Sequence, residues 1–98
     1  MTYNYSVSWK VSFTKKAAKQ YSKLHNAVKS SIDLLAMEIT LKGPVRGNWS
    51  NYSKLSKTTH HCHLKRGNPT YVACWEVIDR TAKLVEVYYV GSHEKAPY

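Results

Sequence analysis

The sequence predicts an α+β fold in which a two-helix hairpin covers one face of a four-stranded, largely antiparallel sheet. One segment of alternating polarity comes first, two segments of helical periodicity follow, and three further strand segments close the chain. Short turns join the last three strands, as is typical of antiparallel neighbours. Helices early in the chain and strands late in it indicate one α+β domain over residues 1–98, with the order β-α-α-β-β-β.

The first 25 residues predict a strand followed by a helix. Residues 7–13 alternate between apolar and polar side chains, which indicates a half-buried strand. Its inner face would consist of Val7, Trp9, Val11 and Phe13. Thr14 is a suitable N-cap for a helix over residues 15–25. The side chains of this helix that we expect to face inward are Ala17, Ala18, Tyr21 and Leu24.

A second helix is predicted over residues 27–41, with Asn26 as its N-cap and Gly43-Pro44 at its end. The short link between the helices predicts an antiparallel hairpin. Apolar positions recur at helical spacing and indicate a core-facing stripe: Val28, Ile32, Leu35 and Ile39.

Residues 43–59 are rich in Gly, Ser, Asn and Thr, and we expect a loop there. Three larger side chains in this segment are predicted to anchor it on the domain: Trp49, Tyr52 and Leu55. Stacking of Trp49 or Tyr52 on a nucleic-acid base is the alternative.

Three strands are then expected over residues 60–66, 70–78 and 84–91, with turns at 67–69 and 79–82. In the middle strand, alternation separates Ala73, Trp75 and Val77 from Val72, Cys74 and Glu76. In the last strand it separates Val85, Val87 and Tyr89 from Glu86 and Tyr88. A glutamate on one face predicts that this face is open, so the side of the sheet away from the helices would receive a ligand.

The strand over residues 60–66 carries the side chains with the richest chemistry. Alternation places His61, His63 and Lys65 on one face, about 6–7 Å apart at a rise of roughly 3.3 Å per residue, and places Cys62 and Leu64 on the other. Two imidazoles and an ammonium suit a reacting phosphate, which needs a proton acceptor on one side and a donor or cation on the other. His93 and Tyr98, near the end of the chain, are further candidates.

The chain is strongly basic, with 15 Lys and Arg against six Asp and Glu and a net charge of +9. Residues 1–32 and 39–75 contain no acidic residue, so the positive charge is segregated. This predicts a polyanionic partner, either RNA, DNA or an acidic protein, and a basic surface that only aids solubility is the alternative. The lysines that we expect to contact phosphates are Lys15, Lys16, Lys19 and Lys23 on the first helix, and Lys54 and Lys57 in the loop.

Other classes of protein fit less well. The sequence has no apolar run long enough to cross a membrane and no signal-peptide pattern, so we expect a cytoplasmic protein. Cys62 and Cys74 fall in predicted strands and are expected to be reduced core thiols. The histidines and cysteines lack the paired spacing of zinc sites, so we predict no metal and no cofactor.

The order of elements, together with two short motifs, resembles the RelE/ParE toxin superfamily of bacterial toxin–antitoxin systems. The motifs are Trp75-Glu76-Val77-Ile78-Asp79 and Tyr89-Val90-Gly91-Ser92-His93-Glu94, which look like the last two strands of RelE-type toxins. RelE-type members are ribosome-dependent endoribonucleases that cut mRNA, whereas ParE-type members poison DNA gyrase. By position, the resemblance implies a site made of His61, His63, Lys65, His93 and Tyr98.

One position departs from the family pattern. RelE has an arginine early in the next strand, where this chain has Val72, and Lys65 or Arg66 could replace that cation on the phosphate.

The resemblance also implies a mechanism without metal. The 2′-hydroxyl of the RNA would attack the adjacent phosphate, with His61 or His63 as base, His93 as acid, and Tyr98 against a base or the phosphate. The implied partners are the ribosome, with its rRNA and mRNA, and a cognate antitoxin, while the toxin alone would be a monomer that enters a larger complex with its antitoxin. A ParE-type gyrase poison and a non-catalytic basic module that binds RNA or protein are the alternatives.

Overall fold

The computed structural model of the chain describes residues 8–65 and 67–98. Its elements are β1 (Lys10–Phe13), α1 (Lys15–Ser22), α2 (Asn26–Lys42), β2 (Ser53–Lys54), β3 (Thr59–Lys65), β4 (Tyr71–Asp79), β5 (Leu84–Ser92) and the short 3-10 helix η2 (His93–Lys95). The predictions for Val7 and Arg66 fall outside the described residues.

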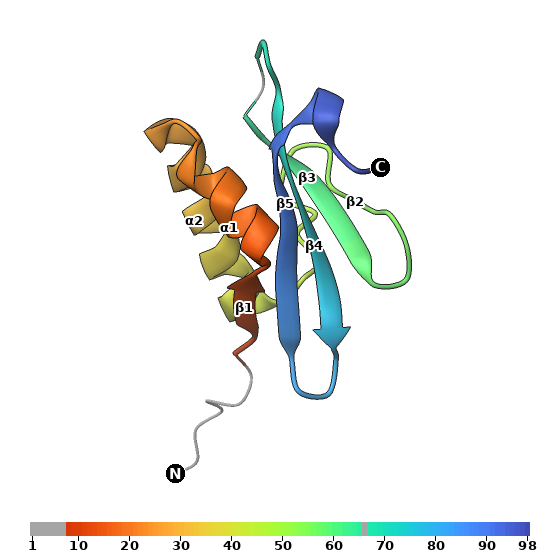
Figure 1. Cartoon of the computed structure of the whole chain (residues 1–98). Helices are drawn as coiled ribbons and strands as arrows, with labels where there is room; N and C mark the ends of the chain where they lie inside the picture. The colour runs from red at the N-terminus through yellow and green to blue at the C-terminus, as the bar shows by residue number, and fades with distance from the viewer. Residues whose placement is uncertain (1–7, 66) are drawn as a thin grey trace.

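The α+β architecture is confirmed. Both helices lie on one side of the sheet and the C-terminal tail, residues 93–98, lies on the other (Figure 1). Within the described residues the sheet has five strands, not the four expected, in the order β1-β5-β4-β3-β2. β1 runs parallel to β5, and every other pairing is antiparallel.

The extra strand, β2, lies inside the segment that was expected to be only a loop. It pairs Ser53 with His61 and Lys54 with His60, along the edge of β3. Two residues are too few to show an alternating pattern, so β2 can be recognised only from its pairing with β3 and not from its own sequence. Trp49 and Tyr52 pack against the main core, which confirms their role as anchors.

The boundaries of the helices follow local hydrogen bonds. Thr14 caps α1, because its Oγ1 accepts a hydrogen bond from the amide of Ala17 at 3.0 Å. The helix ends at Ser22 rather than at residue 25, and Ala18, which was expected to face inward, is exposed. At α2 the predicted cap is wrong by one residue, since the N-cap is His25 and Asn26 is already helical.

The main core lies between the helices and the sheet, as the apolar stripe of α2 predicts. Val28, Ile32, Leu35 and Ile39 are at most 1% exposed. They belong to one cluster with the inward side chains of β3 to β5, among which Trp75 donates its Nε1–H to the Pro44 carbonyl at 3.0 Å.

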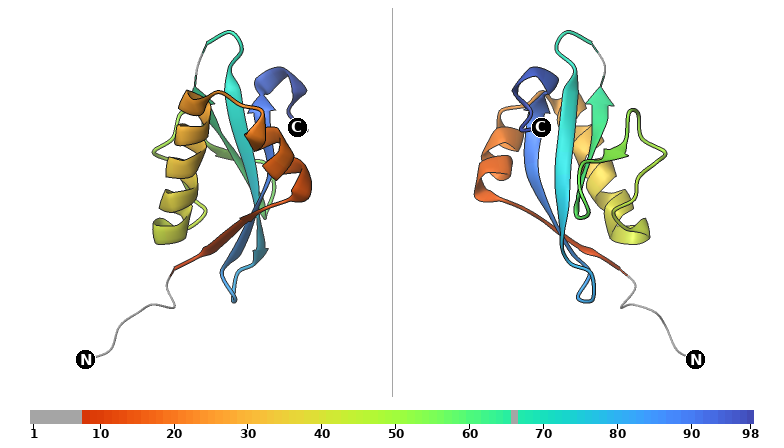
Figure 2. Two further views of the ribbon diagram at one scale, coloured as in Figure 1. Left: turned by 60° about the vertical axis from the view of Figure 1, so that its left-hand side comes forward. Right: turned by 90° about the vertical axis from the view of Figure 1, so that its right-hand side faces the viewer.

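A second cluster lies on the opposite face of the sheet. It consists of Val72, Cys74 and Tyr89, with Ala96 of the tail packed against it. Val72 and Cys74 are fully buried, so the face that was predicted to be open is covered in part by the tail (Figure 2).

The position of Tyr89 in this second cluster corrects the predicted alternation of β5. The register shifts between Cys74, which pairs with Tyr89, and Trp75, which pairs with Val87, so Tyr88 is an inserted residue. Tyr89 therefore faces away from Val85 and Val87, and its hydroxyl donates to the Ser92 carbonyl at 2.7 Å. A Cβ at Gly91 would lie 2.7 Å from that hydroxyl, which explains the glycine in this motif.

Candidate functional site

The three histidines of β3 divide between the two faces of the sheet, as alternation predicts. Cys62 and Leu64 enter the main core, and on the same face His60 stacks on Trp75 with ring centroids 5.7 Å apart. His61 and His63 lie on the opposite face, on the side of the tail.

The tail brings two further side chains to these histidines. After β5, the amide of His93 donates to the carbonyl of Thr70 at 2.8 Å, which holds the start of η2 beside the start of β4. The ring centroids of His63 and His93 are 5.4 Å apart, and those of His61 and Tyr98 are 4.5 Å apart. We call His61, His63, His93 and Tyr98 the four-ring cluster.

The four-ring cluster is closed by two further contacts. The centroids of His61 and His63 are 6.2 Å apart, and those of His93 and Tyr98 are 6.0 Å apart. Two residues of β3 and two residues of the tail, which lie 30 or more positions further along the sequence, therefore form one group, and four of the five predicted catalytic residues lie in it.

The members of the cluster differ in exposure. His61 is 8% exposed, whereas Tyr98 is 50% exposed and His93 is also exposed. Burial lowers the pKa of His61, a main-chain hydrogen bond with Ser53 opposes this effect, and the charge of His93 adds to it. His61 is thus held as a neutral imidazole at neutral pH, the form that accepts a proton.

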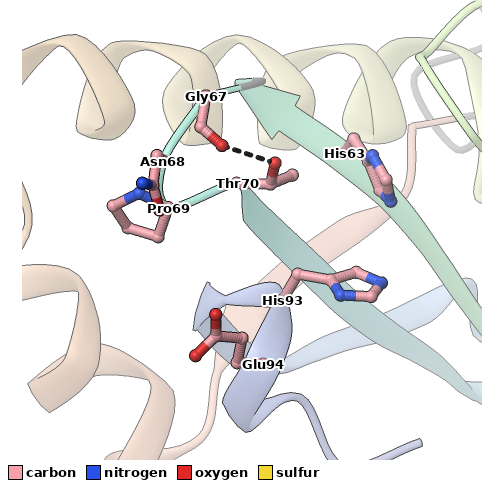
Figure 3. A pocket seen from close by; sticks show the side chains of 7 residues that line it. All are labelled: His63, Gly67, Asn68, Pro69, Thr70, His93 and Glu94. Carbon is pink, nitrogen blue, oxygen red and sulfur yellow. Dashed lines mark hydrogen bonds between the residues drawn. The ribbon is translucent and has the colours of Figure 1, made fainter.

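A hollow of about 300 Å³ lies beside the cluster. It is bounded by His63 on β3, by the turn over residues 67–70, and by His93 and Glu94 at the start of η2 (Figure 3). Of the described residues that line it, none is Lys or Arg.

The fifth predicted catalytic residue, Lys65, is not in this group. The register shifts between His63 and Lys65, which breaks the even spacing that alternation predicted. Lys65 instead lines another hollow, with His25, Ala27 and Val28 near the start of α2.

Two other positions were considered for the phosphate. Arg66 lies outside the described residues. Val72, which stands where RelE has an arginine, is fully buried in the second cluster.

The predicted phosphate-binding lysines are all exposed. Lys16 of α1 and Lys23, the C-cap of this helix, line a groove of about 520 Å³ between α1 and β5, together with Lys95 of the tail. Lys54 lies on β2 and Lys57 on the segment that leads into β3.

Two supporting residues were not predicted. Ser53 Oγ lies 3.1 Å from His61 Nδ1, and the Tyr52 hydroxyl lies 2.7 Å from His60 Nδ1. Each contact joins residues eight positions apart across the β2–β3 hairpin. The sequence does show a hydroxyl residue eight positions before His60 and before His61, but this spacing predicts a contact only when the β2–β3 hairpin is known.

Three further features are the cysteines, the grouping of metal-binding side chains and the length of the helices. Cys62 and Cys74 are free and buried, and burial raises the pKa of each thiol to about 12. Among residues 8–65 and 67–98, no three or more His, Cys, Asp or Glu side chains are grouped so as to hold a metal ion. In the same residues, no helix has the length and apolar character needed to cross a membrane.

With this geometry in view, the class of fold is that of the RelE toxins. Neither a family model nor a curated protein matches the sequence. Solved structures do: an arginine-to-alanine double mutant of Escherichia coli toxin RelE in the free state has a TM-score of 0.70 and 20% identity, over 91% of this chain and 87% of that one.

Two complexes extend the comparison. The RelBE2 toxin–antitoxin complex of Mycobacterium tuberculosis gives a TM-score of 0.65 and 21% identity over 89% of this chain and 100% of that chain. The archaeal RelE–RelB complex of Pyrococcus horikoshii gives 0.63 and 11%, over 91% of this chain and 99% of that chain. The chain therefore has the RelE fold, as the motifs of its last two strands indicated.

Proposed function

We propose that this protein is the toxin of a toxin–antitoxin system and that it cleaves mRNA on the ribosome. The observation that carries the proposal is the four-ring cluster, in which three imidazoles and a phenol meet beside a hollow on a basic protein. The fold shared with RelE toxins supports the same function.

The chemistry follows from the RNA itself. A base removes the proton of the 2′-hydroxyl, whose oxygen attacks the adjacent phosphorus, and the bond from phosphorus to the 5′-oxygen breaks while an acid protonates that oxygen. Imidazole suits both proton transfers, because its ordinary pKa is about 6.5. This reaction balances without a metal ion or a second substrate.

The roles can be assigned from exposure. His61 or His63 would be the base, and the neutral state of His61 favours it for that role. The exposed His93 would be the acid, since it can regain a proton from water after each turnover. The half-exposed ring of Tyr98 would stack on a base or bind the phosphate, and Lys65 and Arg66 stay proposed phosphate contacts.

The alternative functions can be separated in one experiment. The protein is added to a translating extract and the 5′ ends of the mRNA are mapped, with a parallel assay for gyrase-linked DNA breaks. Cuts that appear only on ribosomes support the proposal. DNA breaks would instead support a ParE-type gyrase poison, and neither product would support a non-catalytic binding module.

We expect the lysines of α1 and of its C-cap, Lys23, to bind rRNA phosphates. Replacing Lys16 and Lys23 by Gln should weaken ribosome binding and reduce the slope of log affinity against log salt by about 1–2, because fewer counterions are released. The sites of cleavage should not move, since phosphate contacts carry little sequence information. The measurement is ribosome binding across a series of salt concentrations.

The matched control is a variant with Lys10 and Lys42 replaced by Gln. Both lysines are exposed, and the control loses the same two charges away from the α1 groove. If the two variants show the same salt slope, α1 is not part of the ribosome interface.

We also propose a cognate antitoxin as partner, since a nuclease of cellular mRNA must be restrained in its own cell. An acidic segment that folds on binding would suit a domain of charge +9. Co-expression with the neighbouring reading frame should restore growth, and hydrogen exchange on the complex should show protection at residues 60–65 or 91–98. Protection confined to the outer side of the helices would mean that inhibition does not work by covering the four-ring cluster.

A further inference from the structure

β2 is a strand of two residues, and one of its side chains contacts the candidate base. Ser53 pairs with His61 across the hairpin, and its Oγ lies 3.1 Å from His61 Nδ1. The serine is exposed, so this contact is not a requirement of core packing.

The proposed role of His61 sets the direction of this contact. Ser53 Oγ can either donate to Nδ1 or accept from it, because a hydroxyl does both and a neutral imidazole has two tautomers. If Oγ donated, the proton of the neutral ring would be on Nε2, which could then not act as a base. A base that works through Nε2 therefore needs Nδ1–H as the donor and Ser53 Oγ as the acceptor.

We propose that Ser53 is a positioning residue, which holds His61 as the Nδ1-protonated tautomer and so leaves Nε2 as the basic nitrogen of the site. A histidine with one nitrogen fixed by a hydrogen bond presents the other for proton transfer. The direction of this hydrogen bond rests on the proposed function, whereas the contact itself is a property of the folded chain.

His60 supplies a contrast within the same hairpin. It also has a hydroxyl on its Nδ1, that of Tyr52 at 2.7 Å, but it is 1% exposed and its Nε2 is buried in the domain. His61 lies on the other face, with its ring against Tyr98. The same contact between a hydroxyl and Nδ1 therefore belongs to the core at His60, whereas at His61 it leaves Nε2 available as a base.

Several titratable or charged side chains near His61 will influence its measured pKa. The titratable or charged side chains on neighbouring positions are His63 on β3, Cys74 opposite it on β4, Lys54 on β2, and His93 and Tyr98 in the tail.

The tautomer can be read directly by long-range proton–nitrogen correlation spectroscopy on the full chain labelled with ¹⁵N-histidine. His61 is assigned by comparison with a His61→Gln variant. At neutral pH we expect its Nδ1 to show the protonated shift and its Nε2 the unprotonated one. The reverse pattern would overturn the proposal.

Ser53→Ala tests the contribution of the hydroxyl. We expect it to shift the His61 nitrogen resonances toward a mixture of tautomers, to lower the pKa of His61, and to slow cleavage on ribosomes by roughly 2- to 10-fold, the range for loss of one hydrogen bond. Ser53→Thr keeps the hydroxyl and should restore all three readouts. Ser30→Ala, at an exposed serine on α2, is the matched control.

The outcomes separate this inference from the proposed function. Nitrogen shifts of His61 that do not change in Ser53→Ala would remove Ser53 from this role, even if the protein cuts mRNA. The expected tautomer in a protein that cuts no mRNA would leave the positioning role in place and reject the nuclease.

Discussion

Replacement of His93 by alanine is expected to lower mRNA cleavage on ribosomes about 10²–10⁴-fold, the usual contribution of a general acid. His93 is exposed on η2, and its ring meets His63 at 5.4 Å and Tyr98 at 6.0 Å. Among the other members of the cluster, His61 is buried, His63 is partly buried, and burial raises the pKa of Tyr98, which makes its phenol the weaker acid. Cleavage is measured by mapping mRNA ends in a translating extract, and growth arrest on induction is the companion readout.

His25→Ala is the control for this variant. His25 is also exposed, but it lies at the start of α2 and makes no side-chain cap hydrogen bond. Both variants should keep the circular dichroism spectrum and thermal midpoint of the parent, while only His93→Ala loses activity. A folded His93→Ala protein that cuts at the parental rate would show that the acid is another group.

The elements of this fold were predictable wherever a pattern extended over four or more residues. Val28 to Ile39 gave the buried stripe of α2, and alternation in β3 separated His61 and His63 from Cys62. Such patterns work because each apolar residue that they place inside the domain contributes burial energy on its own. The end of α1 and the start of α2 moved by one to three residues, since helix ends depend on single hydrogen bonds.

What the sequence could not reveal are the places where one strand adjusts to another. The register shift at Tyr88 moved Tyr89 to the other face, and the shift after His63 carried Lys65 away from the histidines. A bulge arises from the pairing of two strands, so neither strand predicts it alone. Ser53 was missed for the same reason, because its contact with His61 exists only through the β2–β3 pairing.

The tail shows the opposite case. Nothing in the local pattern of residues 93–98 places Tyr98 4.5 Å from His61, yet the family resemblance pointed to both positions. The resemblance was informative because it carries the tertiary contacts that periodicity lacks. It was less informative at Val72, where the chain departs from the family pattern and buries an apolar side chain under the tail.

His60 gives the second large expected effect, which is on stability in acid. The ring is 1% exposed, is stacked on Trp75, and has its Nδ1 2.7 Å from the Tyr52 hydroxyl. A buried imidazole with an uncharged neighbour on one nitrogen and no hydrogen-bond partner on the other, among the described residues, resists protonation. Burial accordingly lowers the pKa of His60 to about 4.

The direction of the effect follows from proton uptake. The unfolded chain binds a proton at His60 below its ordinary pKa of about 6.5, whereas the folded chain binds it only near pH 4. The free energy of unfolding should therefore be unaffected by His60 above pH 6.5 and fall as the pH drops from there toward 4. The full loss, reached below pH 4, is about 3 kcal/mol, or roughly 300-fold in the ratio of folded to unfolded protein. His61, whose pKa is also lowered, adds to the loss in the same direction.

A His60→Phe variant tests this expectation, because it keeps a flat ring on Trp75 and removes the titrating group. Urea unfolding at a series of pH values between 7.5 and 4.5 gives the free energy of unfolding for the parent, for His60→Phe and for His25→Ala. We expect a shallower decline in acid for His60→Phe alone. Equal declines in the parent and in His60→Phe would mean that another group causes acid unfolding.

The same comparison separates two reasons why activity would fall in acid. Protonation of the base would reduce cleavage in a folded protein, whereas protonation of His60 would loosen the strand that carries His61 and His63. In His60→Phe the second cause is absent, so the acid limb of its activity profile should report the base alone. If the midpoint of that limb then matches the pKa of His61 measured on the folded chain, protonation of His61 causes the loss of activity in a folded protein. The additional loss of activity that only the parent shows is then caused by protonation of His60.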